Sequence, residues 1–151
     1  GRSMDIFLDT SFAVSLIIKT EKTEKTREFF RIADNLVTSL SVYEETFYIG
    51  LKLLADKRLG IKSPFSLREY IRKNCYDFAS EFITSLDELF SKINLLSDTK
   101  DLGVVRDIAI RYRLLPNDAL IAATCKHYGI RKIATFDEDF KRVDFLEILE
   151  L

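Results

Sequence analysis

The sequence contains few glycines, and the five that it has stand far apart, at positions 1, 50, 60, 103 and 129. A dinucleotide-binding loop needs the pattern G-x-G-x-x-G, and a phosphate-binding P-loop needs two glycines close together in one turn. Neither pattern can be written with glycines at these positions. We therefore do not expect a nucleotide-binding protein of the Rossmann or P-loop type.

Cysteine and histidine are also scarce, with two of the first and one of the second. Cys75 and Cys125 lack C-x-x-C spacing and fall in apparent helices, which favours ordinary thiols in a reducing compartment. His127 falls near the end of a predicted helix, away from the acidic residues that stand out elsewhere in the chain. A histidine-based nuclease or a serine–histidine triad is therefore poorly supported.

Long apolar runs and a strong charge of either sign are missing as well. The stretch from Phe12 to Ile18, interrupted by Ser15, is far shorter than the roughly 20 residues of a membrane helix. No secretory signal sequence opens the chain, and together with the thiols this favours the cytoplasm. The net charge of −1 is a mild argument against a nucleic-acid binder, although the acids of a metal-dependent nuclease would offset its basic residues.

The length and composition fit one globular domain. A chain of 151 residues with 47% hydrophobic and 31% charged residues can bury a sizeable core and keep a soluble surface. Residues 1–3 precede Met4 and resemble a remnant of cloning. A single domain is therefore expected over residues 4–151.

Short apolar runs alternate with helical patterns along the chain. The runs predict five strands, at 5–9, 35–38, 93–96, 132–137 and 145–149. The helical patterns cover about 12–18, 23–33, 41–59, a stretch from Pro64, 78–89, 102–112 and 119–125. This alternation favours a three-layer α/β/α domain with a mostly parallel sheet and an extra helical segment in its middle.

Four carboxylates fall where predicted strands end or helices begin. Asp9 and Asp137 end the first and fourth strands, and Glu44 lies in the first turn of the helix after the second strand. Asp118 lies in the first turn of an apolar helix that follows another helix. Since the carboxyl ends of parallel strands share one edge of a sheet, these acids are expected to converge there.

Converging carboxylates indicate a cation site. Each acid alone is explained as well by a turn or by a helix dipole, but four crowded carboxylates repel one another unless a cation neutralises them. Mg²⁺ and Mn²⁺ prefer such hard oxygen ligands. A bound ion of this kind can activate water and stabilise the charge on a phosphate under attack.

Four segments resemble the signatures of the PIN-domain family, in the order in which the family has them. They are LDTS at 8–11, SVYE at 41–44, NDALIAA at 117–123 and TFDEDF at 135–140. The resemblance implies a Rossmann-like α/β/α fold and an Mg²⁺- or Mn²⁺-dependent endoribonuclease that acts on RNA. A single domain of this size most resembles VapC-type toxins, which are commonly homodimers and are inhibited by a VapB-type antitoxin.

The resemblance also implies roles for individual residues. The metal-binding and catalytic acids would be Asp9, Glu44, Asp118 and Asp137, and the supporting polar positions Ser11, Asn117 and Thr135, with Asp139 as an extra acid. Glu45 directly follows Glu44 and is the alternative to it. Glu44 is preferred here because of its spacing from Ser41.

Other functions stay open beside the toxin. The chain could be a PIN-type RNA-processing nuclease, or a catalytically silent module that binds RNA or protein. A phosphatase of the haloacid dehalogenase type is disfavoured, because it needs a second acid two residues after the first, where this chain has Ser11. The helices between about 51 and 89 carry no signature, and their Phe-rich face fits a dimer surface, an antitoxin surface or the core.

Overall fold

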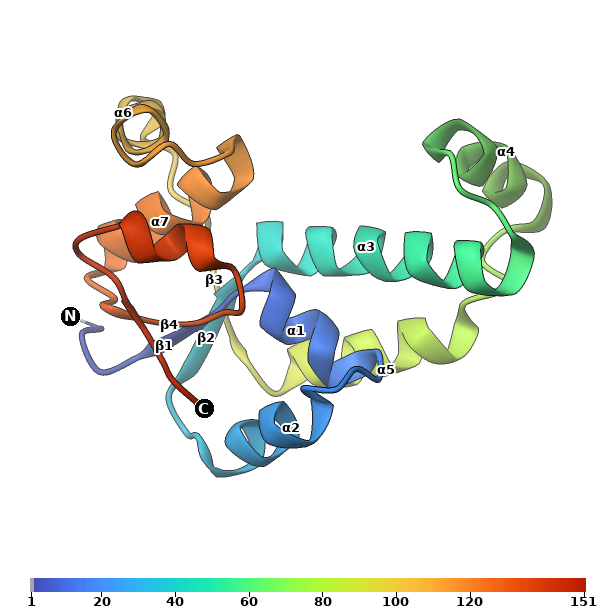
Figure 1. Cartoon of the computed structure of the whole chain (residues 1–151), viewed down its shortest axis with the longest axis horizontal. Helices are drawn as coiled ribbons and strands as arrows, with labels where there is room; N and C mark the ends of the chain where they lie inside the picture. Colours follow the sequence, from blue (N-terminus) through green and yellow to red (C-terminus); the bar gives the residue numbers. More distant parts are fainter. Residues whose placement is uncertain (1) are drawn as a thin grey trace.

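Five short parallel strands form the centre of the protein, whose residues 2–151 are described by a computed structural model (Figure 1). The strands are β1 (Ile6–Leu8), β2 (Leu36–Ser39), β3 (Asn94–Leu96), β4 (Lys132–Ala134) and β5 (Glu147–Ile148). Their order across the sheet is β3-β2-β1-β4-β5, and all neighbouring strands run parallel. The predicted sheet is therefore confirmed.

Helices cover both faces of this sheet. They are α1 (Thr10–Ile17), α2 (Thr23–Ile32), α3 (Leu40–Leu59), α4 (Pro64–Asn74), α5 (Ser80–Ser91), α6 (Leu102–Tyr112) and α7 (Pro116–Tyr128). Successive side chains of a strand point to opposite faces. Accordingly, Phe7 of β1 packs in the cluster that α6 and α7 contribute to, whereas Leu8 packs in the cluster formed with α1, α2 and α5. This arrangement confirms the predicted three layers.

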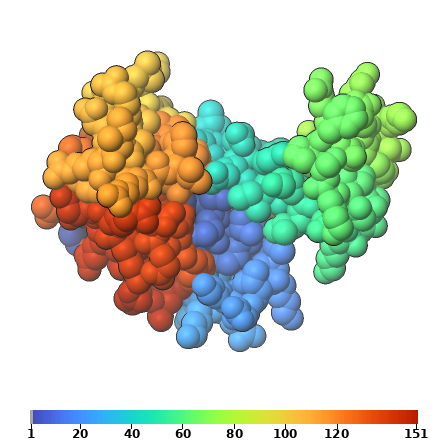
Figure 2. Space-filling view, turned by 45° about the horizontal axis from the view of Figure 1, so that its top comes forward, coloured from blue at the N-terminus to red at the C-terminus, as the bar shows by residue number. Residues whose placement is uncertain are grey.

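Helix α3 extends well beyond the sheet and carries α4 at its far end (Figure 1). In the space-filling view, the green α4 lobe stands off from the body and leaves a notch between itself and the gold α6 (Figure 2). A separate core holds this arm together, because Phe78, Phe82 and Leu86 are buried there against α3. In the segment between about 51 and 89, the Phe-rich face is therefore part of the core at these three positions.

Helix α7 is buried on most sides, as its apolar sequence predicts. Six of its residues are buried, including Ile121 and Cys125, and Pro116 stands in its first turn, where proline is favoured. Gly129 ends the helix with a φ of +73°, a conformation that other residues rarely adopt. Within residues 2–151, neither α7 nor any other helix is long and apolar enough to cross a membrane.

Gly50 of α3 lies directly against the ring of Phe82 in α5. A Cβ atom at this position would overlap the ring of Phe82, which is itself buried in the core of the arm. We therefore expect Gly50→Ala to lower the free energy of unfolding by about 1–3 kcal/mol, as overpacked cores do. Urea or thermal unfolding measures this loss.

Gly103 provides the matched control for Gly50→Ala. It lies in α6, and the nearest heavy atom to a Cβ there is 3.6 Å away, an ordinary contact. Gly103→Ala is expected to leave stability unchanged or raise it slightly, because alanine is the better helix former. Equal destabilisation by both substitutions would contradict the close packing described at Gly50.

The strand order places a ligand site at a defined point. The chain proceeds from β1 outward to β2 and β3, and then crosses to the other side of β1 to form β4 and β5. Such a reversal opens a crevice at the carboxyl ends of the two strands that flank it, here β1 and β4. Asp9 follows β1 directly, and Asp137 lies just after β4.

Candidate metal centre

A pocket of about 480 Å³ lies at this point, between α1, α3, α7 and the segment after β4. Four acids line it, namely Asp9, Glu45, Asp118 and Asp137. They come from four segments that are far apart in the sequence, and we call their common site the acidic pocket. Three of the four acids preferred from the sequence, Asp9, Asp118 and Asp137, therefore lie in one pocket. Glu44 does not line it, and the neighbouring Glu45 does.

Asp9 is held in place by two hydroxyl groups. It is 3% exposed, and its Oδ2 accepts hydrogen bonds from Thr135 Oγ1 at 2.6 Å and from Ser11 Oγ at 3.2 Å. The same hydroxyls accept from the chain after β4, Ser11 from the N–H of Phe136 and Thr135 from the N–H of Asp137, both at 2.9 Å. Ser11 and Thr135 therefore fix the Asp9 carboxylate relative to the segment that carries Asp137.

Two acids of the pocket lie close to a fifth acid, Asp139. Asp118, Asp137 and Asp139 each offer a carboxylate oxygen, and these oxygens lie within 4.8 Å of one another. Asp137 Oδ1 also accepts a hydrogen bond of 2.9 Å from the N–H of Asp139, which lies in the first turn of the short helix η1 (Glu138–Arg142). The extra acid predicted at Asp139 thus lies beside two of the principal acids.

The acids perturb one another's protonation. Burial raises the pKa of Asp9 to about 6, although the hydrogen bonds from Thr135 and Ser11 work against this rise. The pKa of Asp118 rises to about 7, first because of burial and then because of the negative charges of Asp9, Asp137 and Glu45. Such shifts are typical of functional sites, and their upward direction means that the pocket disfavours crowded ionised carboxylates without a cation.

Glu45 and Glu44 point to different sides of α3. Glu45 lines the acidic pocket, and its Oε2 accepts a hydrogen bond of 2.7 Å from Asn117 Nδ2. Glu44 instead lines a separate apolar groove with Tyr43 and Phe47. Neighbouring residues of an α-helix are rotated by about 100° about its axis, so both cannot face one site. The geometry thus favours Glu45 over the preference for Glu44 drawn from the sequence.

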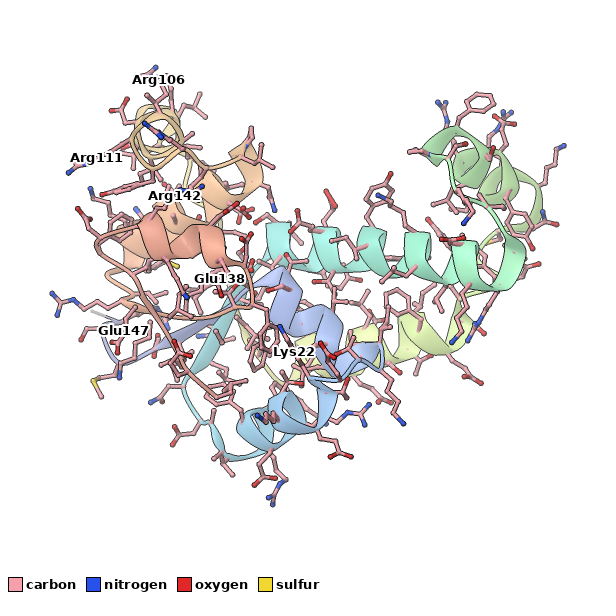
Figure 3. The ribbon with its side chains drawn as sticks, in the orientation of Figure 1. Lys22, Arg106, Arg111, Glu138, Arg142 and Glu147 are labelled. Carbon is pink, nitrogen blue, oxygen red and sulfur yellow. The ribbon has the colours of Figure 1, made fainter. Side chains whose placement is uncertain are left out.

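Arg142 is a polar residue of this region that the sequence analysis did not single out. Its Nη1 donates to Asp139 Oδ1 at 3.0 Å, while Nε and Nη2 donate to the backbone oxygens of Tyr112 and Arg113 at 2.8 and 2.7 Å. Arg142 is the last residue of η1, and its side chain therefore joins this short helix to the end of α6 (Figure 3). The only signal in the sequence is its three-residue spacing from Asp139, which is also common in plain surface ion pairs.

The donors of the acidic pocket suit a hard divalent cation. Its acids offer only oxygen atoms, and its remaining polar residues are threonine, serine and asparagine. Mg²⁺ and Mn²⁺ prefer such oxygen ligands, whereas softer metals favour thiolates and imidazoles. Burial, and then the charge of Asp9, raise the pKa of the Cys125 thiol, which does not line the pocket.

The sequence has named relatives. A family model described as "PIN domain" matches residues 6–146. The chain is 35% identical to a Methanocaldococcus jannaschii protein named Ribonuclease VapC6, over 156 aligned positions that cover 97% of each chain. It is also 47% identical to Ribonuclease VapC2 of the same organism over 95 residues. This alignment covers 58% of this chain and 64% of that protein.

Solved structures share the fold. VapC20 of Mycobacterium tuberculosis, described as a Sarcin-Ricin loop cleaving toxin, matches with a TM-score of 0.66 at 19% identity, over 95% of this chain and 98% of its own. DNA-bound VapBC from Salmonella typhimurium matches with a TM-score of 0.64 at 18% identity, over 96% of both chains. At these identities the likeness establishes the fold alone, which is the one predicted from the sequence.

Proposed function

Because the chain belongs to the PIN-domain family, we propose that it is an endoribonuclease that uses Mg²⁺ or Mn²⁺ to hydrolyse phosphodiester bonds of RNA. The observation that carries this proposal is the convergence of Asp9, Glu45, Asp118 and Asp137 on one pocket at the carboxyl ends of β1 and β4. Two relatives that are named ribonucleases, at 35% and 47% identity, support the same reaction.

The acids of the pocket would hold the ion. Asp9, Asp118 and Asp137 supply its carboxylate oxygens, with Glu45 and Asp139 beside them. A bound divalent ion lowers the pKa of water and stabilises the charge that builds up on the phosphate. A cation would favour the ionised forms of both groups, and most of all that of Asp118, whose pKa of about 7 is the more strongly raised of the two, beside about 6 for Asp9.

Neutral and basic residues around the pocket orient these acids. Ser11 and Thr135 hold Asp9 Oδ2, and Asn117 holds Glu45 Oε2, which leaves Glu45 Oε1 for water or substrate. Arg142 holds Asp139 in the same way on the outer side. Hydrogen-bond partners of this kind fix the direction of a ligand and are expected to matter for the affinity of the metal.

We further propose that the protein is the toxin of a VapBC-type pair, that it forms a homodimer, and that it acts in the cytoplasm under the control of a VapB-type antitoxin. The VapBC complexes among the structural relatives, from Salmonella typhimurium and Rickettsia felis, support the pairing with an antitoxin. The alternative is a PIN-type RNA-processing nuclease. A short reading frame directly upstream that encodes a DNA-binding protein would favour the toxin.

Cleavage of RNA in the presence and absence of metal tests the activity. We expect the purified protein to cut a single-stranded RNA with Mn²⁺ or Mg²⁺, to lose this activity in EDTA, and to regain it when excess Mn²⁺ is added. Gel analysis of end-labelled RNA follows the products. The reason is that acids line the pocket while none of its lining residues within 2–151 is basic, so a metal ion would have to supply the positive charge that a phosphate needs.

An Asp9→Asn variant purified in parallel serves as the control for contaminating nucleases. Equal cleavage by the wild type and by this variant contradicts the proposal, and so does cleavage that persists in EDTA. A calorimetric titration that detects no Mn²⁺ binding, together with no cleavage, would instead support a catalytically silent binding module.

A further inference from the structure

The wall of the acidic pocket is apolar. Val14 of α1, Ile49 of α3 and Leu115 at the start of α7 line it together with the acids, and we call these three side chains the apolar rim. No lysine, arginine or histidine among the described residues lines the same pocket. The acids and their ion therefore account for only one part of the surface that a substrate meets.

Leu115 is the most exposed member of the rim. It is 73% exposed, whereas the preceding Leu114 is 6% exposed and packs in the core. Pro116 follows it in the first turn of α7, which restricts the backbone of Leu115 to an extended conformation, with φ −65° and ψ 156°. The turn thus holds a large apolar side chain in water at the pocket, three residues from Asp118.

The size of the pocket leaves room for more than an ion. A water molecule takes about 30 Å³ in the liquid, so an ion with six water-sized ligands needs roughly 200 Å³. The pocket holds about 480 Å³, which also suffices for the organic part of a nucleotide. A base attached to the scissile phosphate is tethered through a single ribose, and it must therefore lie next to the acids.

We propose that the apolar rim packs against the nucleobase adjacent to the scissile phosphate, so that Leu115 is a substrate-positioning residue. This inference rests on the proposed ribonuclease function. Apolar side chains hold a base by contact with its face, while recognition of its identity needs hydrogen bonds to its edge. The side chains of Val14, Ile49 and Leu115 carry no hydrogen-bonding group, so the rim itself positions a base without selecting its identity.

The test compares intact and abasic RNA. The cleavage site of a short RNA is first mapped, and two further substrates are then made that lack the base on the 5′ or the 3′ side of the scissile bond. For the wild type, one of these two substitutions is expected to lower kcat/KM about 10-fold, the typical effect of losing one stacked base. The other is expected to have little effect.

Leu115→Ala should remove this difference in kcat/KM between intact and abasic RNA. We expect the variant to show a higher KM for intact RNA, an unchanged Mn²⁺ affinity, and the same kcat/KM for intact and abasic RNA within about twofold. Leu115→Met, which keeps an apolar side chain of similar volume, should restore the wild-type pattern. Leu102→Ala is the matched control, because Leu102 is a leucine of similar exposure, 79%, on α6 outside the pocket.

Other outcomes separate this inference from the proposed function. If the wild type cuts RNA but the abasic penalty is the same in Leu115→Ala, or absent at both positions, the rim does not hold a base and the inference is wrong. If Leu115→Ala leaves cleavage intact but weakens binding of the antitoxin, the rim receives a protein side chain instead, and the inference is again wrong. If the wild type cuts no RNA, the proposed function fails first.

Discussion

Asp118→Asn is expected to abolish RNA cleavage and at the same time to stabilise the metal-free protein. The substitution removes a proposed metal ligand. Mutating a residue that only hydrogen-bonds a metal ligand lowers activity by up to roughly 100-fold, so the fall in kcat/KM for Asp118→Asn should be larger than that. It also removes one of the negative charges that face Asp9, Asp137 and Glu45. For this half-buried carboxyl, we expect a gain of about 1 kcal/mol after solvent screening, or roughly 3 °C in Tm.

The stability difference between this variant and the wild type should depend on pH in a defined direction. The pKa of Asp118 is raised from 3.8 to about 7 in the folded protein, so the wild type is penalised only where this carboxyl is ionised. The penalty is absent below pH 3.8, grows as the pH rises, and is complete above about 7. In EDTA, thermal unfolding at pH 8 should therefore show the larger advantage of Asp118→Asn, and unfolding near pH 4 almost none.

Metal should reverse the order of stability of the wild type and Asp118→Asn. Saturating Mn²⁺ stabilises whichever protein binds it, by about 2.7 kcal/mol at a concentration 100 times its Kd. The wild type should then unfold at a higher temperature than Asp118→Asn. Asp107→Asn is the control, because Asp107 lies on α6 with a side chain 75% exposed and outside the pocket. A variant that is less stable in EDTA, or that gains as much from Mn²⁺ as the wild type, contradicts the role given to Asp118.

The strands and most helices could be predicted because each follows from a local pattern. The sheet is covered on both faces, so its strands are continuous apolar runs, and the run predicted at 5–9 contains β1 at Ile6–Leu8. The helix predicted at 41–59 ends as α3 does because Gly60, in a left-handed conformation, directly follows it. The convergence of Asp9 and Asp137 followed in turn from the parallel sheet, since β1 and β4 are neighbours in it.

Features that depend on packing between distant segments could not be predicted in this way. The bonds of Arg142 join η1 to the end of α6 across about thirty positions, and no spacing in the sequence specifies such a pair. The rotation of α3 about its axis is set by its contacts with α1, α5 and α7, so the sequence identifies the helix but not which face meets the pocket. For this reason the spacing from Ser41 was an insufficient guide to Glu44.

Glu45→Gln and Glu44→Gln form a matched pair that tests which face of α3 meets the acidic pocket. Both remove one carboxylate from α3 and preserve its shape, but only Glu45 lines the acidic pocket and bonds Asn117. We expect Glu45→Gln to lower kcat/KM at least 10- to 100-fold and to weaken Mn²⁺ binding. Glu44→Gln should stay within about twofold of the wild type, as surface substitutions usually do.

The reasons for this difference lie in the surroundings of the two side chains. Glu45 adds its charge to those that raise the pKa of Asp9 and Asp118, so its oxygens belong to the field that attracts a cation. Glu44 faces Tyr43, Phe47 and Tyr48 in the apolar groove, where an ion would lack further ligands. Steady-state cleavage and Mn²⁺ calorimetry on both variants measure the effect. The reverse order, with Glu44→Gln the damaging change, would mean that α3 presents its other face to the metal.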